Sequence, residues 1–281
     1  GGMNLFDSIC HTFGTMATGG FSTKNASIGH YTSPYIQMVI TLFMFIAGIN
    51  FALHFKMLQG HLRVFGQDPE FRFFALFILI VTAIITFTVW GQNYQGLGEA
   101  FRYSLFQAVS ITTTTGYATA DFELWAPLAQ ILLFFAMFMG GCAGSTGGGM
   151  KCMRIMVLLK QAGRELTRLV HPRAVISLKF GGRPLSEDVI SGIWGYFILY
   201  LLLACLAVIG LSALGVDVLT SIAAVIACIS NIGPGLGQVG PADNYAHLPL
   251  IGKWLLTFCM LLGRLEIYTV VILLFPGFWR K

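Results

Sequence analysis

The chain has 281 residues, of which 56% are apolar and only 10% are charged, and phenylalanine alone occurs 24 times. No soluble domain of this length needs so many apolar residues for its core, so the balance indicates an integral membrane protein. The formal net charge of +5 is mild, and its distribution along the chain is more informative than its sum.

The first apolar stretch, residues 4–17, is too short to span a bilayer but has the length of a re-entrant pore helix. It ends at Thr18 and Gly19, which we interpret as the first of three loops that form an ion filter. Residues 21–31 are polar and return to the outer surface, and residues 35–54 are a predicted span that starts after Pro34. We therefore expect the chain to open inside a repeated unit, without that unit's first helix.

A second unit follows. Asp68 and Glu70 are acids at the start of the next predicted span, residues 71–90, where the helix dipole favours them. Residues 99–111 are a second re-entrant helix, which ends in four threonines and Gly116. Threonines favour helices poorly, and the glycine permits a twist that turns successive carbonyls the same way. Since rings of carbonyls can replace a cation's hydration shell, this stretch predicts an ion filter.

Two acids, Asp121 and Glu123, follow the second filter on the expected outer face. Simple solvation and a cation-attracting vestibule explain them equally well.

The next apolar helix, residues 125–139, is about 22 Å long at 1.5 Å per residue and is interrupted before it can cross. We call the interruption, residues 140–149, the glycine loop; its notable members are Gly140, Gly141, Gly144, Ser145, Thr146, Gly147, Gly148 and Gly149. Irregular backbone at membrane depth is unsatisfied in lipid, so the loop is expected to border a water-filled cavity or protein. It lacks the Gly-Lys-Ser/Thr sequence of a Walker phosphate loop. The helix is expected to resume over 150–161.

Eight basic residues and one acid lie between Lys151 and Arg183. The positive-inside rule places this connection in the cytoplasm. A cytoplasmic membrane loop explains the charge better than a nucleic-acid site does.

The last unit begins with Ser186 as a helix cap, and its helix runs to about residue 214. Residues 217–229 are a third re-entrant helix, followed by the third filter, Asn231, Ile232 and Gly233, and by a predicted span over 248–275. Arg264 lies inside this span, where a charge is costly unless it faces water or a partner. It is therefore a functional candidate; a snorkelling or Glu-paired arginine is the structural alternative.

Aligning Gly19, Gly116 and Gly233 gives a repeat of about a hundred residues, enough for two spanning helices and a re-entrant hairpin. Continuous apolar spans favour a helical bundle over a barrel. The expected fold is thus an all-α membrane protein of helix, pore-loop, helix units. Its expected parts are an incomplete unit at 1–63, a complete unit at 64–163, a cytoplasmic linker at 164–186 and a final complete unit at 187–281.

The six cysteines and six histidines do not have the spacing of metal ligands, and no group of residues resembles the catalytic set of an enzyme.

Taken together, residues 17–23, 112–117, 140–151, 231–237 and the late Arg264 resemble the Trk/Ktr/HKT potassium transporter superfamily, closest to the TrkH family of bacterial membrane subunits. The resemblance implies a single-chain pore of four units around a pseudo-fourfold axis, which takes up potassium across the bacterial inner membrane. It implies K+ at the filters and no organic cofactor in this chain.

The resemblance also assigns residue roles. It implies a cation-binding filter formed by Thr18, Gly19, Thr114, Thr115, Gly116, Asn231, Ile232 and Gly233, and a gate formed by the glycine loop and Arg264. It further implies a homodimer and a cytosolic nucleotide-binding regulatory subunit of the TrkA type. The chain departs from the pattern because it has three filters, so we expect one and a half units to be missing.

The leading hypothesis is a channel-like pore that the glycine loop and Arg264 close. One alternative is an ion-coupled secondary carrier with a broken-helix site. Another is an assembly subunit that conducts nothing. Three loops that recur in the same direction favour the pore over the carrier.

Overall fold

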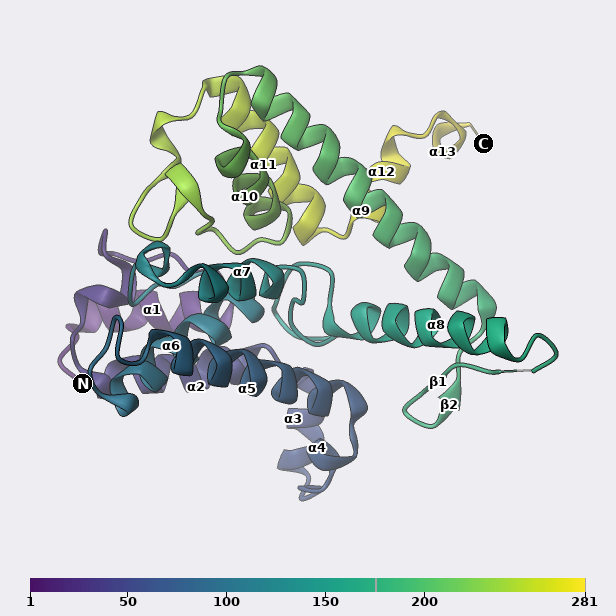
Figure 1. The fold of residues 1–281 in the computed structure, drawn as a ribbon, viewed down its shortest axis with the longest axis horizontal. Coiled ribbons are helices and arrows are strands. Elements are labelled where there is room, and N and C mark those ends of the chain that lie inside the picture. Colours follow the sequence, from purple (N-terminus) through teal and green to yellow (C-terminus); the bar gives the residue numbers. More distant parts are fainter. Residues whose placement is uncertain (175, 281) are drawn as a thin grey trace.

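The computed structural model describes residues 1–174 and 176–280, and they are mostly helical (Figure 1). The first half contains α1 (Leu5–Met16), η1 (Ser27–His30), α2 (Pro34–Ala47), α3 (Phe51–Leu58), α4 (Val64–Gln67), α5 (Pro69–Val89), α6 (Leu97–Thr112), η2 (Phe122–Leu124) and α7 (Pro127–Ala136), where η marks a 3₁₀ turn.

The second half contains α8 (Cys152–Val170), β1 (Lys179–Phe180), β2 (Arg183–Pro184), α9 (Glu187–Ala213), α10 (Val218–Ile229), η3 (Gly237–Val239), η4 (Tyr245–His247), α11 (Leu250–Arg264), α12 (Ile267–Val271), η5 (Ile272–Leu274) and α13 (Pro276–Trp279). The two strands form an antiparallel hairpin in which Lys179 pairs with Pro184.

The three short helices predicted before the filters are present as α1, α6 and α10. Polar side chains start two of them: Asn4 accepts a hydrogen bond from the backbone of Asp7, and Asp217 accepts one from Thr220. Such caps satisfy backbone donors that have no partner inside the helix. Each short helix packs against neighbouring helices: α1 against α2, α6 against α5 and α2, and α10 against α9 and α11.

Two helices among the described residues, α5 and α9, are long and apolar enough to cross a membrane. Their starts follow the sequence signals, because Asp68 caps α5 at Phe71 and Ser186 caps α9 at Val189. The predicted spans at 71–90 and from Ser186 to about 214 are therefore confirmed as helices.

The other two predicted spans, 35–54 and 248–275, are not continuous, and in this respect the sequence prediction was wrong. The first is α2 and α3, bent by 99° at a break, and the second is α11 and α12 with η5, bent by 115°. At the second break Glu266 has φ of 66°, which no α-helix permits. At the first break, Ala47 and Gly48 offer backbone carbonyls to another segment, as described below.

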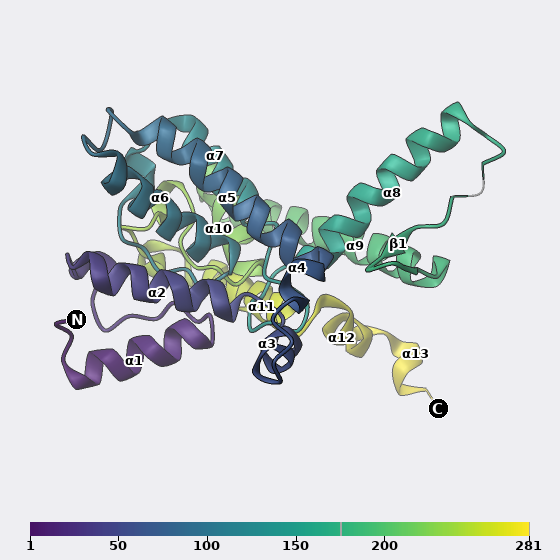
Figure 2. The same cartoon turned by 90° about the horizontal axis from the view of Figure 1, so that it is seen from below.

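Helix α8 is longer than predicted: it ends at Val170, beyond the expected end at residue 161. It extends with the hairpin away from the bundle of α1, α2, α5 and α6 (Figure 2). Its buried Arg164 forms an ion pair at 2.7 Å with Glu187 at the start of α9. The basic segment is therefore a helix and a hairpin fixed to the last unit.

We expect Asp217→Ala to lower stability by about 1 kcal/mol, because the first turn of α10 loses its cap. Asp217→Asn should change stability much less, since asparagine also caps. The Thr220 N–H lowers the pKa of Asp217 below its ordinary 3.8. The stabilisation by the carboxylate is therefore present above that ordinary value and is lost as the pH falls through the lowered pKa.

Thermal unfolding of both variants and the unmodified protein, at neutral and at acid pH, tests this. Equal losses in the alanine and asparagine variants would show that the cap does not stabilise α10.

Candidate functional site

The three predicted filters share one backbone conformation. The first residue of each is left-handed: Thr18, Thr114 and Asn231 have φ of 49°, 59° and 57°. A glycine two residues later is left-handed as well: Gly20, Gly116 and Gly233 have φ of 68°, 82° and 109°. Residues other than glycine rarely adopt this conformation, so its recurrence at three equivalent places identifies one repeated motif.

Backbone hydrogen bonds fix the register of this repeat. The N–H groups of Gly19, Thr115 and Ile232 each donate to the carbonyl five residues earlier, at 2.8, 2.9 and 2.8 Å. Gly20, and not Gly19, is therefore the equivalent of Gly116 and Gly233. The predicted alignment was wrong by one residue, because two adjacent glycines fit the sequence pattern and only the backbone conformation distinguishes them.

The filters lie directly against one another. A Cβ atom on Gly20 would be 1.9 Å from the carbonyl oxygen of Thr115, and one on Gly116 would be 1.7 Å from that of Ile232. Each glycine thus lets a carbonyl of the next filter approach its own backbone. A Cβ atom on Gly233 would meet no described atom within 4 Å. The first filter therefore contacts the second and the second contacts the third, while no described carbonyl approaches Gly233 of the third.

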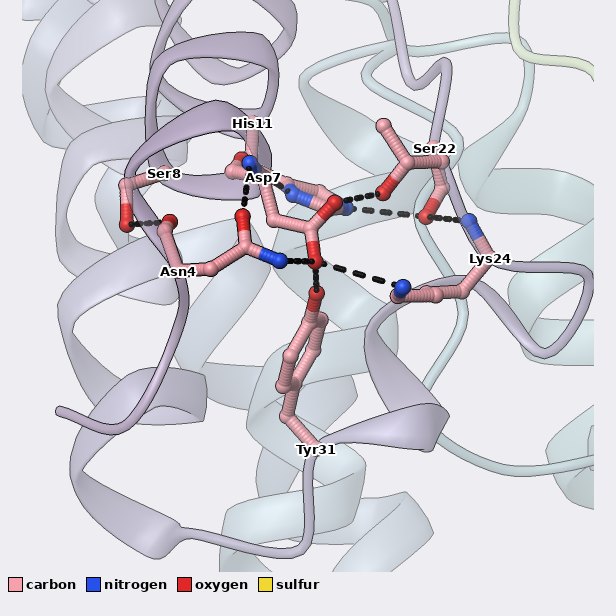
Figure 3. A network of polar contacts seen from close by, with 8 residues as sticks. Asn4, Asp7, Ser8, His11, Ser22, Lys24 and Tyr31 are labelled. Atoms are coloured by element: carbon pink, nitrogen blue, oxygen red, sulfur yellow. Dashed lines mark hydrogen bonds and ion pairs between the residues drawn. The ribbon is translucent and has the colours of Figure 1, made fainter.

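A polar network supports the segment that leaves the first filter (Figure 3). The carboxylate of Asp7, only 4% exposed, accepts hydrogen bonds from Thr23 at 2.5 Å and Tyr31 at 2.9 Å, and lies 3.3 Å from the Lys24 ammonium. The sequence analysis missed this network. An acid inside an otherwise apolar helix, followed by a polar return segment, is the signal that could have found it.

The second filter is joined to the first by Tyr117, which is completely buried. Its hydroxyl group lies 3.3 Å from the carbonyl oxygen of His11 and 3.2 Å from that of Phe21, and can donate to either. A Cβ atom on Gly14 would be 2.3 Å from this hydroxyl. The absence of a side chain at Gly14 therefore makes room for the link.

The glycine loop contacts the first residue of every filter. The Thr18 hydroxyl lies 2.9 Å from the carbonyl oxygen of Thr146 and 2.7 Å from that of Ala17, and can donate to either. The Thr114 hydroxyl accepts from the N–H of Gly148 at 2.7 Å. A Cβ atom on Gly148 would lie 2.9 Å from the Cβ of Asn231. The loop thus borders protein on several sides, and at Gly148 it has no room for a side chain.

The break between α2 and α3 also receives this loop. The N–H of Cys142 donates to the carbonyl of Gly48 at 2.9 Å, and that of Thr146 donates to Ala47 at 3.3 Å. In return, the N–H of Phe51 donates to Gly144 at 3.0 Å. The break is therefore explained by partners far away in the sequence, since the groups that a continuous helix would pair internally pair with the loop instead.

Arg264, the last residue of α11, also reaches the loop. Its guanidinium donates to the carbonyl of Thr146 at 3.0 Å and to that of Ala17 at 3.4 Å. Glu266 pairs with Arg154 of α8, and Arg264 has no ion pair within residues 1–174 and 176–280. The Glu-paired alternative for Arg264 is thus not what the structure shows.

The acid Glu123 supports the third filter's exit. Its carboxylate accepts the N–H of Gly237 at 2.5 Å, while Asp121 accepts the N–H of Glu123 at 3.0 Å. The bond to Gly237 ties the segment after the second filter to the segment after the third, and it gives Glu123 a structural contact that neither sequence interpretation anticipated. In the described part of the chain, no cluster of three or more His, Cys, Asp or Glu residues could hold a metal ion.

Three short helices that each lead into a left-handed loop, beside helices long and apolar enough to cross a membrane, define a helical membrane protein. A family model described as TrkH, cation transport protein, matches residues 1–279, and the chain belongs to that family. Its members are transporters and not enzymes.

The chain is 45% identical to the Trk system potassium uptake protein TrkH of Salmonella typhimurium, over all of this chain and 58% of that protein. It is 39% identical to the Trk system potassium uptake protein TrkG of Escherichia coli, again over all of this chain and 58% of the relative. The crystal structure of the potassium transporter TrkH from Vibrio parahaemolyticus matches with a TM-score of 0.94 at 44% identity. That match covers 99% of this chain and 60% of the other. The predicted all-α membrane fold is confirmed, and the chain spans somewhat more than half the length of these relatives.

We expect Gly20→Ala to disrupt the first filter and Gly19→Ala to be tolerated. Alanine at 20 would be left-handed, at a cost of about 1–3 kcal/mol, and would overlap the Thr115 carbonyl. A Cβ atom on Gly19 has its nearest neighbour at 3.6 Å.

Thermal unfolding and folded yield of the two variants, side by side, check this register. A larger loss for Gly19→Ala would restore the alignment predicted from the sequence.

Proposed function

We propose that this chain forms most of a gated, channel-like pore for potassium uptake across the bacterial inner membrane. The observation that supports it best is the meeting of three equivalent strained loops with one glycine loop. The relatives' names, potassium uptake proteins, support potassium as the transported ion.

The proposed ion path is lined by backbone carbonyls. We assign it to Thr18 with Gly19 and Gly20, to Thr114, Thr115 and Gly116, and to Asn231, Ile232 and Gly233. Helices α1, α6 and α10 end at these loops, and a helix C-terminus has partial negative charge that favours a cation. Backbone carbonyl oxygens can replace the water around an ion at a site without side-chain ligands.

The open side of Gly233 supports a fourth filter there. The chain spans 58% of its relatives' length, and we propose that a segment outside this sequence supplies the missing loop. The units would then be residues 1–63, 64–163 and 187–281, with a cytoplasmic linker at 164–186 and one further unit.

The proposed gate is the glycine loop, held by Arg264. The loop contacts the first residue of all three filters, so it would lie in the ion path as the ion leaves them. The guanidinium fixes the Thr146 carbonyl and adds a positive charge that opposes a cation. Release of the loop would open the path.

The proposed partners are a second copy of the transporter and a cytosolic nucleotide-binding subunit of the TrkA type. The words Trk system in the relatives' names fit a transporter with several components. Helix α8 is separated from the glycine loop by two residues and extends away from the bundle (Figure 2). A partner that pulls α8 could therefore move the loop.

An ion-coupled secondary carrier stays a second candidate because α2–α3 and α11–α12 are broken helices. In the first break, however, the freed backbone groups pair with the glycine loop and are not free for a substrate. A carrier also predicts flux that depends on a coupling ion, whereas an opened pore does not.

Replacing Arg264 by Ala, or deleting residues 144–148, should raise potassium flux several-fold. The first change removes the hydrogen bond that holds the Thr146 carbonyl, and the second removes the residues that would block the ion path. The measurement is potassium and sodium flux from liposomes that hold the full-length transporter.

Lys253→Gln is the matched control. It removes a basic side chain from α11 whose hydrogen bond is to the carbonyl of Ala246, seven residues earlier, and not to the glycine loop. Unchanged or lower flux in well-folded Arg264→Ala and loop-deleted protein would refute the gate, and dependence on a coupling ion would favour the carrier.

A further inference from the structure

A buried carboxylate lies at the base of the glycine loop. Glu70 is in the first turn of α5 and is only 5% exposed. Its Oε1 accepts hydrogen bonds from two backbone N–H groups, that of Ala143 at 2.8 Å and that of Met153 at 3.0 Å. One oxygen atom therefore holds both the first half of the loop and the first turn of the helix that follows it.

These contacts are distinct from those of an ordinary acid at a helix start. The sequence suggested that Asp68 and Glu70 both stabilise the first turn of α5. Asp68 does so, because its carboxylate accepts the N–H of Phe71 at 2.8 Å. The Glu70 side chain instead leaves its own helix and reaches residues more than seventy positions later.

The start of α8 needs such an acceptor. The first amides of a helix have no partner inside it and favour negative charge. Lys151, the residue before α8, makes no side-chain cap and is left-handed, with φ of 70°. Glu70 therefore supplies from another element the cap that the sequence before α8 lacks.

The two ends of the loop are also joined directly. The N–H of Cys152 donates to the carbonyl of Gly141 at 3.0 Å. With Glu70 on Ala143 and Met153, this bond gives the loop a closed base. A displacement of α8 along its axis would have to stretch both the Met153 bond to Glu70 and the Cys152 bond to Gly141, while the same Glu70 oxygen still holds Ala143.

We propose that Glu70 is a positioning residue that keeps the glycine loop closed by fixing its base to the start of α8. The proposal rests on the gate function proposed above for this loop. It adds a specific link between that gate and the helix that a cytosolic partner would move.

The test is basal potassium flux in liposomes that hold the full-length transporter. Glu70→Ala removes the acceptor and should raise the flux several-fold. Glu70→Gln keeps an oxygen for both amides and should stay near the unmodified level. Glu70→Asp, whose carboxylate is one methylene shorter, should give an intermediate rise and keeps the experiment decisive if the alanine variant folds poorly.

Asp68→Asn is the matched control, because it removes an acid from the same turn while asparagine still caps α5, and its flux should be unchanged. Combining Glu70→Ala with deletion of residues 144–148 distinguishes an effect of Glu70 on the loop from a general loss of stability. If Glu70 acts through the loop, the combined variant conducts no more than the deletion alone.

Three results would overturn the proposal. The first is unchanged potassium flux in well-folded Glu70→Ala and Glu70→Asp protein, and the second is a Glu70→Gln variant that conducts as much as Glu70→Ala. The third is that Glu70→Ala raises the flux by the same factor in the loop-deleted protein as in the protein with the loop. The proposed gate itself fails separately, if neither loop deletion nor Arg264→Ala raises the flux.

Discussion

The structure depends on the need to pair backbone hydrogen-bonding groups at membrane depth, where no water is present to satisfy them. The helical segment that follows each of the three filters is interrupted: between α2 and α3, between α7 and α8, and between α11 and α12. These interruptions meet at the glycine loop. Thr146 is the clearest case, because its N–H donates to Ala47 while its carbonyl accepts from Thr18 and Arg264. Groups that one unit leaves unpaired are thus satisfied by the other two.

The filters show the same principle at the level of backbone strain. A left-handed residue other than glycine costs about 1–3 kcal/mol and persists only where its surroundings fix it. Thr18, Thr114 and Asn231 have this conformation, and each uses its side chain to bond a distant segment. The third makes its bond from the Asn231 amide to the carbonyl of Met260 at 3.2 Å. Glycine would relieve the strain at these positions, but it would remove the side chains that hold the loops in place.

Hydrophobicity, helix caps and the repeat were sufficient to predict the fold class, the short helices and the two long spans. The two bent helices escaped prediction because Gly48 and Glu266 lie in apolar stretches that look continuous, and their partners are remote in sequence. Glu70 was read as a local helix-start acid for the same reason. The choice between Gly19 and Gly20 required φ angles, which composition does not encode. The resemblance grouped Arg264 with the glycine loop, but the carbonyl that it contacts could be identified only in three dimensions.

The three loops share a backbone yet differ in chemistry: threonine and two glycines, two threonines and a glycine, asparagine with isoleucine and a glycine. Because these three copies lie in one polypeptide, a single codon change alters one loop and leaves the other two intact. Natural variation can therefore change the loops one at a time, whereas an assembly of identical subunits must accept each change in every copy at once.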